Sequence, residues 1–85
     1  MKSKIEIYVG LKVREFRLKK DWTQQYLADV LNLSNTFIAN RENPNENDAF
    51  NLDHIDSVAR ALGCKIWDLL PQNPINDEDW PLNNS

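Results

Sequence analysis

The 85-residue chain contains only two glycines, four prolines, one cysteine and one histidine. So few glycines and prolines disfavour a turn-rich, all-β fold. The single cysteine, Cys64, excludes an internal disulfide and a multi-cysteine metal site, and it is typical of a reducing compartment. The single histidine, His54, reads as a surface residue on the polar side of a helix and has no second ligand at metal-binding spacing. No metal and no other cofactor is expected.

Long apolar runs and catalytic motifs are also missing. No stretch of about 18 apolar residues is present, and the first residues lack the apolar centre of a signal peptide. The expected location is therefore the cytoplasm. There is no glycine-rich phosphate loop, no HExxH and no Gly-x-Ser-x-Gly, and the acidic run Asp77–Asp79 has no predicted pocket around it. An enzyme is not expected.

Charge is abundant but unevenly distributed. The net charge is −3, yet residues 1–20 carry seven basic and two acidic residues, and residues 21–85 carry three basic and eleven acidic residues. A basic end on an otherwise acidic protein is suited to contact phosphate. The alternative is that these basic residues form a solvated helix face that contacts no phosphate.

The last fifteen residues differ in composition from the rest. Residues 71–85 hold three acids, three prolines and no basic residue. This composition predicts an acidic, mostly irregular tail after one domain of residues 1–70. Trp80, the one large aromatic residue of the tail, can dock on the body of the protein or on a partner.

Apolar periodicity and capping residues predict a compact all-α domain of five helices. Thr23, Ser34 and Asn51 are good N-caps, and Asn32 and Gly63 suit the left-handed conformation that ends a helix. We expect Leu33 to be buried in a turn. The predicted helices span residues 6–20, 24–31, 35–42, 52–62 and 66–70, with Val9, Val13, Phe16, Ile38, Ile66 and Leu69 in the core and a neighbouring stripe of Ile7, Leu11 and Leu18 on the first helix.

The predicted helices 24–31 and 35–42 are separated by a short turn. Such a pair crosses at a steep angle. Its second helix can pack within a core or enter the major groove of DNA, and the geometry alone leaves both possibilities open.

Most of the chain, about residues 9–70, resembles the lambda-repressor-like helix-turn-helix family, also called the XRE or Cro family. The resemblance implies a five-helix DNA-binding domain, usually a transcriptional regulator that acts as a dimer on a two-fold DNA site. It rests on the order and spacing of Arg17, Thr23-Gln24, Leu27-Ala28, Ile38, Glu42, Ala59 and Leu62-Gly63 within VGLKVREFRLKKDWTQQYLADVLNLSNTFIANRE and LDHIDSVARALGCKIWDLL.

The third predicted helix carries the expected base contacts. Asparagine can bind adenine through two hydrogen bonds, and threonine can offer a hydroxyl to a base or a methyl group to thymine. The resemblance implies that the start and middle of this helix read base edges, which selects Asn35, Thr36, Ala39 and Asn40.

Other polar residues are expected to contact DNA phosphates. Gln24 lies in the first turn of its helix, where free backbone N–H groups and the helix dipole favour an anion. Arg41 is expected to turn outward. The complete predicted set is Thr23, Gln24, Arg14, Lys19, Arg41 and Asn43.

The resemblance also implies an architectural ion pair and a dimer. Arg17 and Glu42 match a buried pair that joins the first helix to the end of the third. By helical phase Trp67 and Leu70 fall on the outer side, and with Trp80 they form the predicted dimer interface.

The chain departs from the family at the end of the third predicted helix and in the loop that follows. Arg41 occupies a position that is usually apolar, and Asn43-Pro44 replaces the usual glycine. The following loop holds Glu46 and Asp48 but no lysine or arginine, which predicts weaker binding to phosphate.

The function expected from these features is a sequence-specific DNA-binding transcriptional regulator, a repressor, which binds a near-palindromic site on double-stranded DNA through residues 35–42. The alternative is an antitoxin-like or adaptor module on the same fold, which binds a protein partner through its acidic tail.

Overall fold

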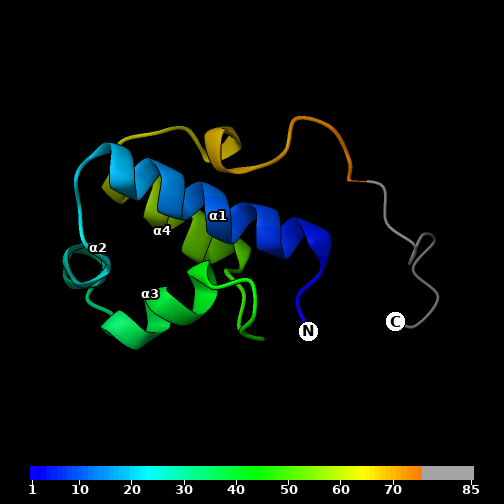
Figure 1. The fold of residues 1–85 in the computed structure, drawn as a ribbon. Coiled ribbons are helices and arrows are strands. Elements are labelled where there is room, and N and C mark those ends of the chain that lie inside the picture. The colour runs from blue at the N-terminus through cyan, green and yellow to red at the C-terminus, as the bar shows by residue number, and fades with distance from the viewer. Residues whose placement is uncertain (76–85) are drawn as a thin grey trace.

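The structure is a computed structural model that describes residues 1–75. It contains α1 (Lys4–Lys19), α2 (Gln24–Val30), α3 (Asn35–Glu42), α4 (Leu52–Leu62) and the short 3₁₀-helix η1 (Ile66–Leu69) (Figure 1). No strand occurs in this part of the chain, so the all-α class is confirmed. The fifth element differs from the prediction, because it is a 3₁₀-helix rather than an α-helix of residues 66–70.

Capping side chains fix the helix boundaries. The predicted caps Thr23, Ser34 and Asn51 each accept a hydrogen bond from a backbone N–H three residues ahead, at 3.0, 3.1 and 2.8 Å. The predicted range 6–20 for α1 was wrong by two residues at its start, because Ser3 and Glu6 form a reciprocal capping box there. Gly63 ends α4 with φ of 69°, in the left-handed region that glycine adopts without strain.

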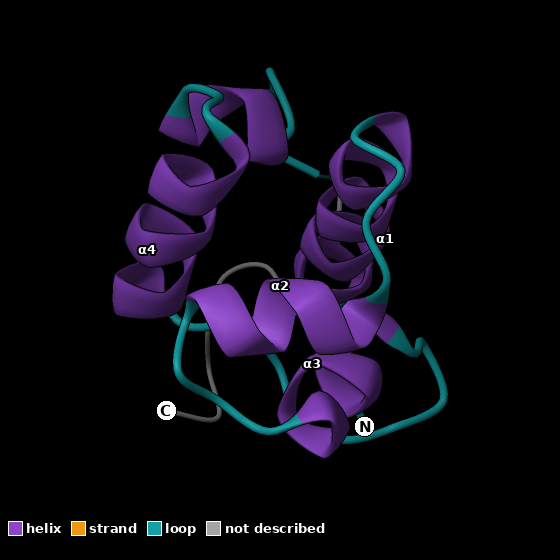
Figure 2. Cartoon of the chain, turned by 90° about the vertical axis from the view of Figure 1, so that its left-hand side faces the viewer, coloured by secondary structure: helices purple, strands orange, loops and turns teal. Residues whose placement is uncertain are grey.

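The core lies between α1 and α4 and is closed by α2, α3 and η1. Figure 2 shows α2 crossing in front of α1 and α4, with α3 beside it. The buried apolar side chains come from every element and are Val9, Val13, Leu27, Ala28, Ile38, Ile55, Val58, Ala59, Leu62 and Leu69.

Several apolar residues lie elsewhere than predicted. Leu33 and Ile66 were expected to be buried, yet they are 36% and 42% exposed, and Leu11 and Leu18 are also exposed. Leu70 was expected on the outer side but is half-buried. The prediction assumed an α-helical period through residue 70, whereas the backbone of Leu70 is extended and its side chain packs against the core.

Helix α1 approaches α3 closely at Gly10. This glycine is buried, and a Cβ atom placed on it would collide with the backbone carbonyl of Arg41 in the last turn of α3. The absence of a side chain therefore lets the two backbones touch.

We predict that Gly10→Ala destabilises the fold. Alanine inside a helix normally stabilises it by about 0.5–1 kcal/mol relative to glycine. Here the added methyl group must displace the Arg41 carbonyl, and such overpacking costs about 1–3 kcal/mol. Urea denaturation should show a lower free energy of unfolding. A variant as stable as the wild type would contradict the close approach of α1 and α3.

Candidate nucleic-acid interface

One face of α3 points away from the core and carries the four residues predicted to contact bases. Asn35 and Thr36 are exposed, and Ala39 and Asn40 are half-buried. Residues three and four apart share one face of a helix, so these four side chains lie together. Ile38, on the opposite face, is fully buried and holds the helix on the core.

A hollow beside this face brings several predicted phosphate-binding residues together. Arg14 comes from α1, Gln24 from the first turn of α2, and Asn43 follows α3. Arg14 is exposed, and it forms no ion pair with any of residues 1–75. The remaining lining residues are Leu11, Ala39, Glu42 and Pro44.

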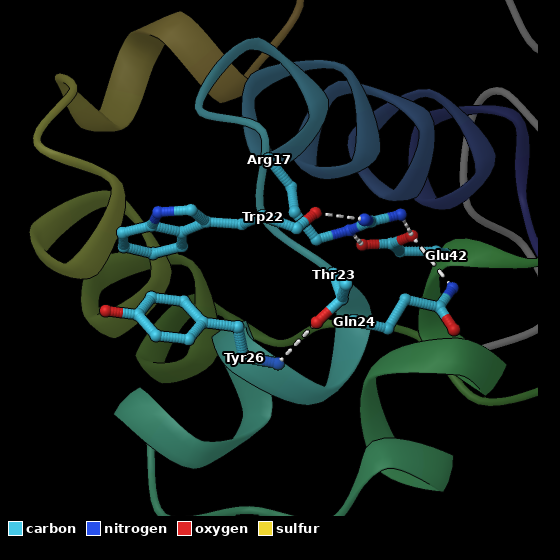
Figure 3. Close-up of polar contacts among 6 residues, drawn as sticks. All are labelled: Arg17, Trp22, Thr23, Gln24, Tyr26 and Glu42. Carbon is cyan, nitrogen blue, oxygen red and sulfur yellow. Dashed lines mark hydrogen bonds and ion pairs between the residues drawn. The ribbon is translucent and has the colours of Figure 1, made fainter.

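Arg17 and Glu42 form a buried ion pair (Figure 3). Glu42 is also one of the residues that line the hollow. The Nε and Nη2 atoms of Arg17 each donate to one Glu42 carboxylate oxygen at 2.9 Å, and the two side chains are 6% and 2% exposed. Nη1 donates to the Trp22 carbonyl at 2.7 Å. The pair therefore joins α1, the turn before α2 and the end of α3.

Gln24 also belongs to this network. Its side-chain Nε2 donates to Glu42 Oε1 at 3.1 Å. The prediction that the Gln24 amide donates to a DNA phosphate missed this partner. Only the packing of α2 against α3 brings Glu42 within hydrogen-bonding distance of Gln24. In the free protein Gln24 fixes the start of α2 to the end of α3.

The remaining predicted phosphate contacts have different surroundings. Thr23 Oγ1 accepts the Tyr26 backbone N–H at 3.0 Å (Figure 3), which leaves its hydroxyl proton to be donated elsewhere. Lys19 lies 3.3 Å from the exposed Glu15 carboxylate. Hydrogen bonds from Lys19 and then from Lys12 lower the pKa of Glu15.

Arg41 does not turn outward as predicted. Its guanidinium lies 3.5 Å from the centre of the Phe37 ring, and Nη1 donates to the Phe37 carbonyl at 3.3 Å. The two residues are four apart on α3, where side chains meet, and the ring face attracts the cation. Arg41 is half-buried, and its Nε has no hydrogen-bond partner among residues 1–75.

His54 has a structural role that its sequence position did not indicate. Its Nδ1 accepts the Asn51 backbone N–H at 3.1 Å, which completes the capping box of α4. Its ring meets Phe37 edge-on, with 4.9 Å between the ring centres. Burial lowers the pKa of His54, the Arg41 charge lowers it further, and Asp53 opposes both.

Lys2 is a buried residue behind the candidate interface that sequence reasoning missed. Its ammonium group donates to the carbonyls of Asn40, Arg41 and Asn43 at 3.0, 2.9 and 2.8 Å. A lysine near the start of a chain gives no sequence signal for burial, since lysine is almost never fully buried.

The structure describes two of the three residues that were predicted to form the dimer interface, Trp67 and Leu70. Trp67 is 68% exposed, with Lys65 Nζ 5.5 Å from its ring centre. Leu70 is half-buried against the core, and Trp80 lies outside the described residues.

Residues 1–75 contain neither a candidate metal site nor a candidate membrane-spanning helix. No group of three or more His, Cys, Asp or Glu side chains there could hold a metal ion. Within the same range no helix has the length and hydropathy needed to cross a membrane.

We predict that Arg17→Met destabilises the fold by roughly 3–5 kcal/mol, because the buried Glu42 carboxylate is left without its cation. Arg17→Met combined with Glu42→Leu should recover much of this loss. Chemical denaturation of the two variants and the wild type measures the difference. Equal damage in the single and double variants would show that the pair contributes no coupling.

We predict that His54 makes stability depend on pH. Its folded pKa lies below the ordinary value of 6.5, so the unfolded chain takes up the proton first as the pH falls. The stabilisation is complete above the unfolded pKa and decreases as the pH falls through the folded pKa. Thermal melts should therefore show a larger loss between neutral and acidic pH for the wild type than for His54→Gln. Parallel curves would assign the loss to carboxylates alone.

Comparisons with known proteins agree with this geometry. A family model described as helix-turn-helix matches residues 13–66, more than half of the chain. The control protein C.BamHI of Bacillus amyloliquefaciens is 37% identical over 71 residues, which cover 82% of this chain and 85% of that protein. The competence pilus inhibition repressor of Acinetobacter baylyi is 33% identical over 78 residues, with 85% and 69% covered.

Among solved structures, a hypothetical transcription factor, NHTF, from Neisseria has a TM-score of 0.71 and 29% sequence identity to this chain. The superposition covers 80% of this chain and 76% of the other. The family model spans α2, the turn and α3, and includes the Arg17–Glu42 pair. The chain belongs to the lambda-repressor-like (XRE/Cro) helix-turn-helix family of DNA-binding transcriptional regulators.

Proposed function

We propose that this protein is a repressor that acts in the cytoplasm by inserting α3 into the major groove of a specific DNA site. The observation that carries the proposal is the face of α3. This face presents the exposed side chains of Asn35 and Thr36, and one turn later it presents Ala39 and Asn40. In this proposal the protein binds DNA and catalyses no reaction, as its membership of a family of DNA-binding regulators suggests.

The side chains of this face suit direct base recognition. Asn35 and Asn40 can each donate to N7 and accept from the N6 amino group of one adenine, and a good bidentate contact discriminates between bases by about 1–3 kcal/mol. Thr36 and Ala39 offer methyl groups to thymine. Asn40 is half-buried, and its backbone carbonyl accepts a hydrogen bond from Lys2. The backbone from which the Asn40 side chain extends is therefore fixed.

Phosphate contacts would surround this face on two sides. Arg14, Gln24 and Asn43 line the hollow next to Ala39, and the Thr23 hydroxyl lies at the start of α2. Gln24 keeps a second amide hydrogen for a phosphate while it donates the first to Glu42. Lys19 and Arg41 would add positive charge from α1 and from the last turn of α3.

The loop after α3 opposes phosphate binding. Glu46 and Asp48 are exposed there, and like charges repel. This observation favours a second function, a protein-binding adaptor on the same fold. A gel shift at two salt concentrations separates the two, because a DNA-binding protein retains a preferred site as salt weakens its non-specific binding.

We predict that selection from a random DNA pool yields a preferred site, and that Asn35→Ala and Asn40→Ala each weaken binding to it by about 1–3 kcal/mol. Binding to unrelated DNA should barely change, because phosphate contacts persist. Asn73→Ala, at an exposed asparagine outside the helix-turn-helix, is the matched control. An equal loss on every DNA sequence would show that Asn35 and Asn40 do not read bases.

We further propose that the active form is a homodimer on a near-palindromic site. One recognition helix covers too few base pairs to mark a genomic site, whereas two copies about 34 Å apart cover two half-sites. The exposed Trp67 and Ile66 of η1 are suitable interface anchors. In this proposal residues 1–70 form the DNA-binding domain, and the acidic tail 71–85, with Trp80, adds to the interface or binds a protein partner.

We predict that the full chain sediments as a dimer at high micromolar concentration and that Trp67→Ser shifts it towards monomer. Cys64→Ser, at a half-buried site, should leave the association unchanged. A monomeric full chain, together with selected DNA that lacks two-fold symmetry, would contradict the dimer.

A further inference from the structure

Lys2 is buried against the end of α3 although it lies outside every helix. It is 5% exposed. Its Nζ atom donates to the backbone carbonyls of Asn40, Arg41 and Asn43 at 3.0, 2.9 and 2.8 Å. A lysine ammonium has three hydrogens, so these three acceptors use its full donor capacity.

The acceptors are groups that a helix leaves unsatisfied. The last carbonyls of an α-helix have no partner within the helix, and together they carry the negative end of the helix dipole. Asn40 and Arg41 belong to the last turn of α3, and Asn43 is its C-cap. A buried cation at this place satisfies the carbonyls and offsets the negative end of the dipole.

Two of these three residues, Asn40 and Asn43, belong to the proposed DNA-facing surface. Asn40 is a proposed base contact, and Asn43 lines the hollow beside Arg14. A loose helix end would let the Asn40 side chain move. The Lys2 ammonium group acts against this movement, because it holds the last carbonyls of α3.

We propose that Lys2 is a positioning residue for DNA recognition: its ammonium group caps the C-terminal end of α3 and holds the recognition helix for base reading. The proposal rests on the proposed function for its DNA part. Lys2 does not touch DNA in this account, because it is buried and its three donors are occupied. Its effect is therefore on the choice between DNA sequences and not on the number of phosphate contacts.

Lys2, which precedes α1, acts together with two residues of α1 that contact the end of α3. Gly10 lies against the Arg41 carbonyl, and Arg17 holds Glu42. Gly10 and Arg17 fix where the end of α3 lies. Lys2 adds the hydrogen bonds that fix the direction of its last carbonyls.

The test compares Lys2→Met with Lys65→Met in the full chain. Both variants lose one positive charge, but Lys65 is exposed and lies next to η1. Binding to the selected DNA site and to a scrambled duplex of equal length is measured at a temperature where every variant is folded by circular dichroism. Lys2→Met should reduce the preference for the selected site roughly tenfold, the scale of one charge-assisted hydrogen bond. Lys65→Met should leave the preference unchanged.

Hydrogen exchange on the free protein tests the capping role without DNA. The Asn43 amide, which bonds to the Ala39 carbonyl in the last turn of α3, should exchange faster in Lys2→Met. The Leu33 amide, which bonds to the Ala28 carbonyl, should not change relative to global stability and is the internal control.

Unchanged exchange at Asn43 would overturn the proposal. An equal loss of affinity on both duplexes would overturn its DNA part. If the wild type prefers no DNA sequence, the proposed function fails, while exchange still decides whether Lys2 caps α3. Should Lys2→Met not fold, Lys2→Arg keeps the charge but cannot direct three donors from one nitrogen atom, and the same directions of change are expected.

Discussion

The orientation of α3 depends on the buried ion pair between Arg17 and Glu42. α3 has eight residues, and among them only Ile38 and Glu42 are buried. Ile38 is the one fully buried apolar side chain of α3, and Phe37 packs against the core only in part, so apolar contacts alone fix the rotation of this helix weakly. The Glu42 carboxylate supplies the second fixed point, because it accepts from Arg17 on α1 and from Gln24 on α2. Since each partner left alone would be an unpaired buried group, the arrangement tolerates few alternatives.

This constraint separates the two faces of α3. The inner face is held by Ile38 and Glu42, and the outer face keeps its polar side chains available. On the side towards α4, the Arg41 guanidinium, the Phe37 ring and the His54 ring lie in contact, so that the cap of α4 is tied to α3. α3 is therefore fixed by α1 and α2 at its end and by α4 along its side.

Local signals in the sequence predicted the helices well, because capping and apolar spacing are properties of neighbouring residues. Thr23, Ser34, Asn51 and Gly63 act as expected. The family resemblance pointed to Arg17 with Glu42. Neither local signals nor the resemblance predicted two other contacts between distant residues. The Gln24–Glu42 hydrogen bond joins residues 18 positions apart, and the Lys2 cap joins residues 38 or more positions apart. Ile66 was misplaced because one short turn has too few residues to reveal its period.

The most direct test of base reading by α3 is an NMR titration of the folded protein with the selected DNA duplex. We expect the side-chain amide signals of Asn35 and Asn40 to shift strongly, together with the backbone signals of α3 and the first turn of α2. The indole signal of Trp67 on η1 should respond to protein concentration and not to DNA sequence. If the selected and scrambled duplexes shift the same signals equally, or if the α3 signals stay in place, α3 does not read DNA and the central claim is wrong.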